Sequence, residues 1–219
     1  MRPLNTRRPG SAAGFSLIEL VIVASLLSVV LGGVLLMGSA SDRAYRTGVV
    51  SSTVEFQAAR TMERIVADVQ GAQLASLTPD PLAGLGTAGI DYVLATGIAG
   101  GELVLSPLRR LRFEYETGEL DNGLDDNGNG LVDEGQVVLI QDVGGPGELR
   151  LVLTHWVREL LEGELDNGLD DNGNGLVDEP GFFVERQGET LTFQLTLQKQ
   201  DPEGRLMTRT ARSSMRVRN

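Results

Sequence analysis

An apolar run of 23 residues, from Phe15 to Met37, constrains the fold of this chain more than any other feature. As a helix rising about 1.5 Å per residue, the run would be roughly 35 Å long, enough to cross the hydrocarbon core of a bilayer. It contains one charged residue, the carboxylate of Glu19. An unpaired carboxylate is costly inside a membrane, so such an acid usually has a partner and a function. The sequence therefore predicts one membrane helix with a functional acid near its start.

The residues around this acid form a recognisable motif. Residues 14–20 read Gly-Phe-Ser-Leu-Ile-Glu-Leu, which resembles the cleavage and methylation signal of the type IV pilin and type II secretion pseudopilin family. The resemblance implies that prepilin peptidase removes residues 1–14 as a cytoplasmic leader, cutting between Gly14 and Phe15 and methylating Phe15. It also implies that residues 15–37 form the transmembrane and assembly helix, in which Glu19 pairs with the terminal amine of a neighbouring subunit.

Two other interpretations of the N-terminus stay open. An ordinary secretory signal would combine the basic residues Arg2, Arg7 and Arg8 with the apolar core and the small residues 38–40. That core, however, exceeds the usual length of roughly 7–15 residues. A plain signal anchor would leave Glu19 without a function. The arginines that precede the apolar run place the N-terminus in the cytoplasm and the C-terminal domain outside. For the family resembled, this means a single-pass inner-membrane protein with a periplasmic domain, or a subunit of an extracellular filament.

Beyond Met37 the chain changes from uniformly apolar to amphipathic. Apolar residues recur at steps of three and four and can line one face of a helix, namely Val54, Ala58, Met62, Ile65, Val69 and Ala72. Charged residues fall between them and are expected to face water, namely Arg60, Glu63, Arg64 and Asp68. Because no proline occurs between Pro9 and Pro79, residues 38–77 are predicted to continue the helix.

Residues 85–219 are predicted to form a β-rich globular domain. Short apolar or alternating runs bounded by Gly, Pro or polar residues indicate strands at 90–95, 102–105, 111–115, 137–141 and 149–153. Alternating apolar residues at 191, 193, 195 and 197 predict a strand with one buried face, and residues 207–217 supply the last strand. A long helix followed by many strands predicts an α+β fold, in which an antiparallel sheet packs on the amphipathic half of the helix.

That architecture is also the one implied by the resemblance to pilins. The segment 59–65, followed by Asp68 and Ala72, loosely resembles minor subunits of the J-type pseudopilin or W-type pilin kind. This second resemblance covers one helical stretch and the size of the domain. It implies a minor subunit as opposed to the major one.

A second informative feature is an acidic segment that occurs twice. Residues 118–134 and 163–179 are identical at all 17 positions, reading Gly-Glu-Leu-Asp-Asn-Gly-Leu-Asp-Asp-Asn-Gly-Asn-Gly-Leu-Val-Asp-Glu. Each copy holds six carboxylates and no basic residue. Closely spaced like charges repel, so a compact loop of this composition needs a counter-ion. Each copy lies between two apolar runs, as a loop inserted into a hairpin would.

The spacing of the oxygen-bearing side chains indicates that this counter-ion is Ca²⁺. With Asp125 as position one, the first copy follows the first nine positions of an EF-hand loop, including the glycine at the turn. All-oxygen ligands favour a hard cation, and flexible carboxylates and carbonyls suit Ca²⁺ better than Mg²⁺. Two bound Ca²⁺ ions are expected. The predicted ligands, with the leucines acting through their carbonyls, are Asp125, Asn127, Asn129, Leu131 and Asp133, and Asp170, Asn172, Asn174, Leu176 and Asp178.

The two copies depart from the EF-hand at position twelve, where Gln136 and Gly181 replace the bidentate glutamate. The loops therefore resemble the Asp/Asn/Gly-rich calcium turns of dockerins and secreted bacterial proteins more than a true EF-hand. An incomplete ligand set suggests weak affinity, on the order of 10⁻⁴–10⁻³ M. The alternative is a pair of solvated acidic turns, because Asn-Gly and Asp-Asn are common turn signals. The missing ligand would come from one of two pairs, Glu134 and Glu179 or Asp121 and Asp166.

Charge and composition argue against several other functions. The net charge is −11, and loss of the three leader arginines would make it −14, which does not favour a nucleic-acid-binding surface. Cysteine is absent, so thiol chemistry and disulfides are excluded. His155 is the only histidine, and no catalytic motif accompanies it, so no enzymatic activity is expected.

The sequence therefore predicts a minor pilin or pseudopilin of a type II secretion or type IV pilus system, with calcium-stabilised loops. The partners that the resemblance implies are prepilin peptidase, the inner membrane, other minor subunits and the major subunit. The alternative is a calcium-dependent adhesin or binding module displayed on a pilin-type anchor. The N-terminal motif does not separate a secretion pseudopilus from a surface pilus, because both use the same machinery.

Overall fold

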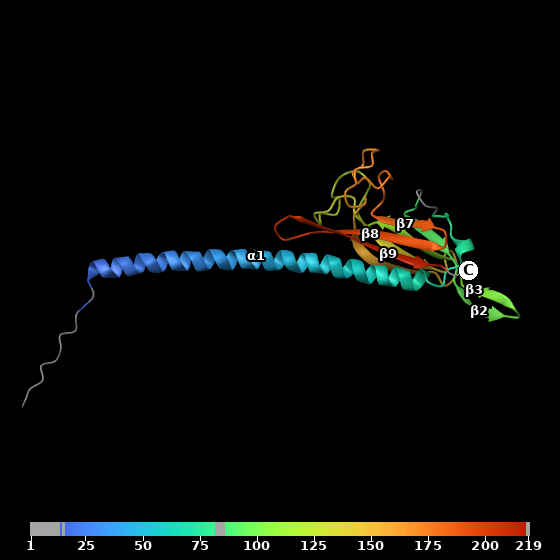
Figure 1. The fold of residues 1–219 in the computed structure, drawn as a ribbon, viewed down its shortest axis with the longest axis horizontal. Coiled ribbons are helices and arrows are strands. Elements are labelled where there is room, and N and C mark those ends of the chain that lie inside the picture. Colours follow the sequence, from blue (N-terminus) through green and yellow to red (C-terminus); the bar gives the residue numbers. More distant parts are fainter. Residues whose placement is uncertain (1–13, 15, 82–85, 218–219) are drawn as a thin grey trace, which may run out of the picture. The chain divides into compact units, whose positions relative to one another are not determined.

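The computed structural model describes residue 14, residues 16–81 and residues 86–217. Its one long helix, α1 (Leu17–Val69), has 53 residues (Figure 1). The chain divides into two compact units, residues 1–45 and residues 46–219. Because α1 continues from the first unit into the second, the same helix has two different surroundings along its length.

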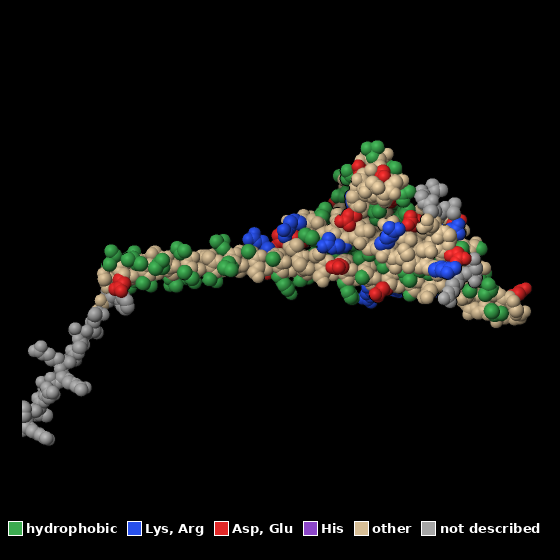
Figure 2. Space-filling model, viewed as in Figure 1, with side chains coloured by type: hydrophobic (Ala, Val, Ile, Leu, Met, Phe, Trp, Pro, Cys, Tyr) green, Lys and Arg blue, Asp and Glu red, His purple; other side chains and the backbone are tan. Residues whose placement is uncertain are grey.

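In the first unit, the side chains of α1 are almost all exposed. Exposed large apolar residues occur along this part of the helix, from Leu17 (82% exposed) to Met37 (76% exposed), and Figure 2 shows green side chains on both of its sides, with tan atoms between them. The helix is long and apolar enough to cross a membrane, judged by its length and composition. The predicted candidate membrane helix is therefore present.

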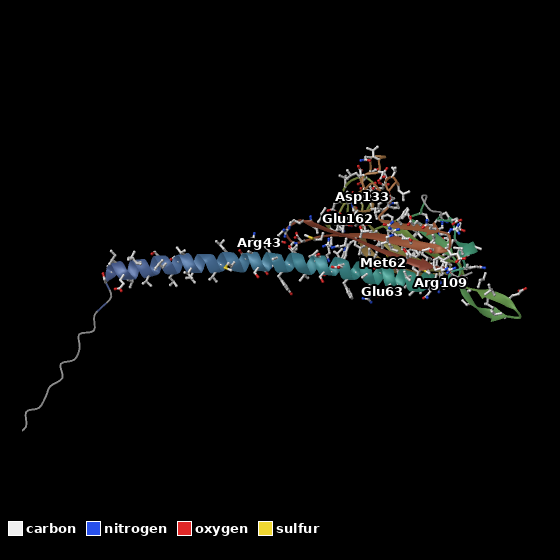
Figure 3. All side chains as sticks on the ribbon, viewed as in Figure 1. Arg43, Met62, Glu63, Arg109, Asp133 and Glu162 are labelled. Carbon is white, nitrogen blue, oxygen red and sulfur yellow. The ribbon has the colours of Figure 1, made fainter. Side chains whose placement is uncertain are left out.

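In the second unit, one face of α1 is buried. Five of the six apolar residues predicted to line that face lie in α1, and the sixth, Ala72, follows its end. All six are at most 4% exposed, and they belong to the same apolar core as the sheet. Figure 3 shows Met62 on the face toward the strands, whereas its neighbour Glu63 lies on the opposite face. Full burial of a side chain such as Ile65 is favourable by about 1.5–3 kcal/mol relative to its exposure. The amphipathic pattern therefore correctly predicted which face of the helix packs on the domain.

Helix α1 ends at Val69 and does not reach residue 77 as predicted. The next residues pair with the chain that leads into the sheet: Ala95 donates its N–H to the Gly71 carbonyl, and Gln73 donates to Val93, both at 3.0 Å. A short 3₁₀ helix, η1 (Leu74–Ser76), follows. Helical hydrogen bonds at residues 71–73 give way to sheet-like ones, so the helix stops before the prolines.

The strands form an antiparallel sheet of seven strands in the order β1-β4-β5-β6-β8-β7, with β9 paired to β8. Two further strands form a separate, exposed hairpin. The α+β class and the antiparallel sheet are thus confirmed. The bounds are β1 (Gly89–Tyr92), β2 (Ala95–Ala99), β3 (Glu102–Leu105), β4 (Arg109–Tyr115), β5 (Gly135–Gln141), β6 (Leu149–Val157), β7 (Phe182–Gln187), β8 (Thr190–Gln200) and β9 (Leu206–Arg216).

The sequence pattern predicted the buried apolar residues of β8, but not the burial of Thr192 and Thr196 on the opposite face, and it missed β7. All four alternating apolar residues of β8 are fully buried. Strand β7 opens with three consecutive buried residues and has no period-two alternation that would reveal it. It is held on both sides, by β8 and by the isolated bridge between Thr87 and Val184. The run predicted as one strand at 90–95 is split between β1 and β2.

The strand register brings the two acidic segments to the same end of the sheet. Tyr115, the last residue of β4, pairs with Gly135, and Gly135 pairs with Val157 at the end of β6. The connection from β4 to β5 carries residues 118–134 and joins two paired strands, as a loop inserted into a hairpin does. The connection from β6 to β7 carries residues 163–179, but β8 lies between these two strands, so the prediction of a hairpin was wrong for the second copy. These segments, called here the first and second acidic loops, project from the sheet as the yellow and orange loops of Figure 1.

Candidate functional site

Each acidic loop is a series of tight turns built by asparagine and glycine. Side-chain oxygens of asparagine accept the N–H two residues further along, which is the hydrogen bond of an Asx turn. Gly123, Gly128 and Gly130 have positive φ angles of 76–88°, which glycine adopts without steric cost. The Asx bonds run from Asn122 to Leu124, Asn127 to Asn129 and Asn129 to Leu131 in the first loop, and from Asn167 to Leu169, Asn172 to Asn174 and Asn174 to Leu176 in the second, at 2.8–3.0 Å.

The aspartate predicted at position one organises the backbone of the turn. Asp125 Oδ1 accepts the N–H groups of Gly128 at 2.7 Å and Asn129 at 3.1 Å, and Oδ2 accepts that of Gly130 at 2.8 Å. Asp170 makes the same three contacts in the second loop. Both carboxylate oxygens are therefore engaged by the protein chain.

The aspartate predicted at position nine ties the end of the loop to its beginning. Asp133 accepts the N–H groups of Asn122 at 3.0 Å and Gly123 at 2.8 Å. Asp133 is only 4% exposed and has a positive φ of 50°. Figure 3 marks it among the loop side chains. Asp178 makes the equivalent contacts in the second loop. These aspartates thus close each loop through the backbone.

The last glutamate of each loop is buried against the loop asparagines. Glu134 Oε1 accepts hydrogen bonds from the side-chain amides of Asn127 at 2.7 Å and Asn129 at 2.5 Å. Glu179 Oε1 accepts one from the amide of Asn174. Of the two pairs predicted to close the site, this pair lies inside the loops. The alternative pair, Asp121 and Asp166, is exposed.

A second glutamate in each loop, absent from the predicted ligand set, is equally buried. Glu119 is 5% exposed and Glu164 is 0% exposed. Glu119 Oε1 accepts the backbone N–H of Asn127 at 2.7 Å, and Glu164 Oε1 accepts that of Asn172 at 3.0 Å. Both residues precede position one of the EF-hand-like spacing, so a comparison with the EF-hand loop does not identify them as ligands. The signal that could have found them is the exact repetition, which begins upstream of that position.

Several of these buried carboxylates have an oxygen with no hydrogen-bond partner in the protein. They are Glu119 Oε2 and Glu134 Oε2 in the first loop and Glu179 Oε2 in the second. A buried carboxylate without a partner is unfavourable by several kcal/mol unless it binds a proton or a cation. Hard oxygen donors of this kind suit Ca²⁺. The loops therefore fit a bound cation, although no three acidic or histidine side chains within residues 16–81 and 86–217 form a ready-made metal cluster.

The two loops share a negative electrostatic environment at Glu159. Burial raises the pKa of the Glu159 carboxyl, and the nearby carboxylates Asp121, Asp133 and Asp166, which come from both loops, raise it further. The hydroxyl of Tyr115 donates a hydrogen bond to Glu159 Oε1 at 3.1 Å, and this bond lowers the pKa of the carboxyl. The loops are therefore close enough for their charges to interact.

The structure also explains why position twelve carries no acid. Gln136 lies within β5, where it pairs with Glu114 of β4. A Cβ atom on Gly181 would lie 1.8 Å from the carbonyl oxygen of Arg158, so only glycine fits there. Position twelve therefore lies inside β5 in the first copy and immediately before β7 in the second.

The N-terminal motif lies at the start of α1. Gly14 is exposed, and Glu19 is exposed in the first turn of the helix, where the helix dipole favours a negative charge. Phe15 lies outside the described residues. The predicted cleavage and assembly residues are therefore accessible where they are described.

His155 lies near the end of β6, an interior strand between β5 and β8. Its Nδ1 is 3.2 Å from Glu116 Oε1, and its side chain is 51% exposed. The same carboxylate oxygen accepts the backbone N–H of Trp156 at 2.9 Å. These contacts give His155 a structural partner.

Comparison with known proteins gives no relative, since no protein-family model, no curated protein and no solved structure matches this chain.

Proposed function

We propose that this chain is a minor pilin-like or pseudopilin subunit that is anchored in the inner membrane and assembled through the apolar half of α1. Prepilin peptidase would cut after Gly14 and methylate Phe15. The domain formed by residues 46–219 would then lie in the periplasm or on an extracellular filament. Glu19 would pair with the terminal amine of the neighbouring subunit.

The observation that carries this proposal is the division of α1. Its first part exposes large apolar side chains from the motif of residues 14–20 onward, and its second part buries one face under an antiparallel sheet. A helix of this kind needs an apolar surrounding for its first part, which a membrane or the helices of other subunits can provide. This layout is compatible with that of a pilin.

In the proposed function each acidic loop holds a Ca²⁺ ion that stabilises the domain. The support is the set of buried carboxylate oxygens that lack a partner, in loops without a single basic residue. When bound, the ion would neutralise these charges, and binding would be linked to the folding of the loops. The loop residues themselves position the carboxylates through the Asx turns and the backbone contacts of Asp125 and Asp133.

Deletion of the gene tests the proposal, with the secreted proteins and the sheared surface fibres compared with those of the parent strain. Loss of several secreted proteins with intact fibres would identify a secretion pseudopilin. Loss of fibres with intact secretion would identify a pilus subunit. If neither changes, an assembly role is contradicted.

A second candidate function, a calcium-dependent binding module on a pilin-type anchor, is favoured by one observation. Each acidic loop exposes three apolar side chains, which Figure 2 shows in green at the loops. Such exposed apolar groups can mark a contact surface. Deleting the loops would then abolish ligand binding while filaments still form. The exposed residues are Leu120, Leu124 and Val132, and Leu165, Leu169 and Val177, at 50–64% exposure.

A further inference from the structure

Three of the four buried glutamates of the acidic loops, Glu119, Glu134 and Glu179, differ from the aspartates because each keeps one carboxylate oxygen that accepts no hydrogen bond from the protein. Both oxygens of Asp125 and of Asp133 already accept backbone N–H groups. Glu119 and Glu134 each use one oxygen for the protein and leave the other without a partner. The glutamates therefore have buried acceptor capacity that the protein does not fill.

In the first loop these two glutamates meet at one residue. Glu119 accepts the backbone N–H of Asn127, and Glu134 accepts its side-chain amide, both at 2.7 Å. Their negative charges therefore lie close together, at 5% and 1% exposure. No ion pair joins either of them to a lysine or arginine in the part of the chain that the structure describes.

The second loop has the same sequence but a different electrostatic setting. Arg158 donates from its two terminal nitrogens to the carbonyls of Leu161 and Glu164, each at 2.9 Å. It therefore places a positive charge at the base of this loop. Glu164 Oε2 also accepts the N–H of Asp178 at 3.2 Å, so one unpartnered oxygen remains here against two in the first loop. The residue 45 positions before Arg158, at the corresponding place beside the first loop, is the uncharged Phe113.

From these contacts we infer that Glu119 and Glu134 are the carboxylate ligands of a Ca²⁺ ion in the first loop, and that the first loop binds the ion more tightly than the second. In the second loop Glu179 keeps one unpartnered oxygen, and Glu164 is assigned as the second ligand because it occupies the position of Glu119 in the repeat. The aspartates at positions one and nine shape the loops through their backbone contacts. This assignment rests on the proposed calcium function, and it adds Glu119 and Glu164 to the ligands while giving the two sites unequal affinities.

The inequality follows from charge and hydrogen bonding. A nearby guanidinium reduces the attraction of a site for a cation, because like charges repel most strongly where water is excluded. A backbone N–H that already donates to a carboxylate oxygen also lowers the free energy gained when the ion binds that oxygen. The Arg158 charge and the additional N–H bond to Glu164 Oε2 are found at the second loop only, although the two loop sequences are identical.

The test is a calcium titration of the full chain in detergent micelles, after removal of metal with a chelator, followed by calorimetry. Two sites of unequal affinity are expected. Glu119→Gln should weaken the tighter site at least tenfold, and Glu164→Gln should weaken the other site at least tenfold. The matched controls are Asp126→Asn and Asp171→Asn, which remove one exposed charge from each loop and should leave both affinities within about threefold.

Thermal unfolding of Glu119→Gln gives a second readout that does not depend on calorimetry. The substitution removes a buried unpartnered charge, so the variant should be at least as stable as the parent in chelator. In calcium it should be less stable than the parent, because it lacks a ligand. A residue with a purely structural role would lower stability in both conditions.

The outcomes separate this inference from the proposed function. If calcium binds but Glu119→Gln and Glu164→Gln leave both affinities unchanged, the ligand assignment is overturned and the calcium function stands. Equal affinities of the two sites would overturn the ranking. If the parent chain binds no calcium, the calcium function fails and the assignment fails with it.

Discussion

The side-chain amide of Asn127 donates a hydrogen bond to the carboxylate of Glu134 at 2.7 Å, deep within the first acidic loop. This contact satisfies one carboxylate oxygen and leaves Oε2 of the same group buried without a partner. An asparagine amide is neutral and does not offset the carboxylate charge. The loop is therefore ordered by hydrogen bonds while its charge remains uncompensated, which is the condition that a bound cation relieves.

Calcium should raise the thermal stability of the full chain in detergent. With a Kd on the order of 10⁻⁴–10⁻³ M, about 10 mM calcium adds about 1.4–2.7 kcal/mol per site to the free energy of unfolding. For a chain of this size each kcal/mol corresponds to about 2–4 °C in Tm. Differential scanning calorimetry in calcium and in chelator measures the change. Magnesium at the same concentration serves as the control and should have a smaller effect, and identical Tm values in calcium and chelator would contradict the prediction.

Replacing Asp68 should weaken the packing of α1 on the sheet. Asp68 was predicted to face water, but its side chain is 18% exposed and accepts hydrogen bonds from Tyr92 and, at 2.5 Å, from Arg109. Burial and the Asp68 carboxylate both raise the pKa of the Tyr92 hydroxyl well above its usual value. Asp68→Asn should lower the free energy of unfolding by about 1–3 kcal/mol, because a charge-assisted hydrogen bond is lost.

Urea unfolding measures this loss, and Glu63→Gln provides the matched control. Glu63 is exposed on the same helix, so its substitution should change stability by less than about 0.5 kcal/mol. Equal effects of the two substitutions would show that the Asp68 contacts contribute nothing.

Asp201 should make the stability of the domain depend on pH. Burial alone would raise the pKa of this carboxyl, but hydrogen bonds from the Arg205 N–H and the Thr47 hydroxyl, together with the Arg205 charge, hold it below its usual value. A carboxyl whose pKa is lower in the folded chain than in the unfolded chain stabilises the folded state at pH values above the unfolded pKa, which is about 3.9. This stabilisation is lost as the pH falls through the lower, folded pKa.

The parent chain should therefore be more stable than Asp201→Asn at pH 7, and this difference should shrink as the pH falls below about 4. Urea unfolding of both chains at pH 7 and pH 3 measures the difference. Glu102→Gln, which alters an exposed carboxylate on β3, is the control and should show little difference at either pH. A difference for Asp201→Asn that is the same at both pH values would count against this role.

Glu19→Ala should leave cleavage intact and impair incorporation into filaments. The expected pairing of Glu19 with the amine of a neighbouring subunit is needed only after the leader has been removed. The measurement compares the amount of subunit in sheared fibres or pseudopili with the amount in membranes. Glu55→Ala, an exposed acid further along α1, is the matched control and should be incorporated normally. Normal incorporation of Glu19→Ala would remove the assembly role of this acid.

Local periodicity predicted the parts of the fold that depend on one segment at a time. The buried face of α1 and the alternation of β8 follow from apolar spacing alone, because each segment presents one face to the core. Strand β7 and the end of α1 depend on partners distant in sequence. Pairing with Thr87 and β8 defines β7, and pairing of residues 71–73 with the chain near Val93 ends the helix. No pattern within those segments specifies these partners.

The candidate site divides in a similar way. The repeated spacing correctly placed two turn-rich acidic loops between strands, since asparagine and glycine determine such turns locally. It did not identify Glu119 and Glu164, because their burial depends on how the start of each loop folds back on its asparagines. The repeated spacing also did not distinguish the two loops, because Arg158 lies outside the repeat, immediately after the end of β6.

Mass spectrometry of the N-terminal peptide from membranes of the source organism shows whether this chain is processed as a pilin-like subunit. We expect a chain that begins at Phe15 and carries one methyl group on its terminal amine. A chain that retains residues 1–14, as a plain anchor would, contradicts this expectation. Cleavage near residues 38–40, as in an ordinary secretory signal, contradicts it equally.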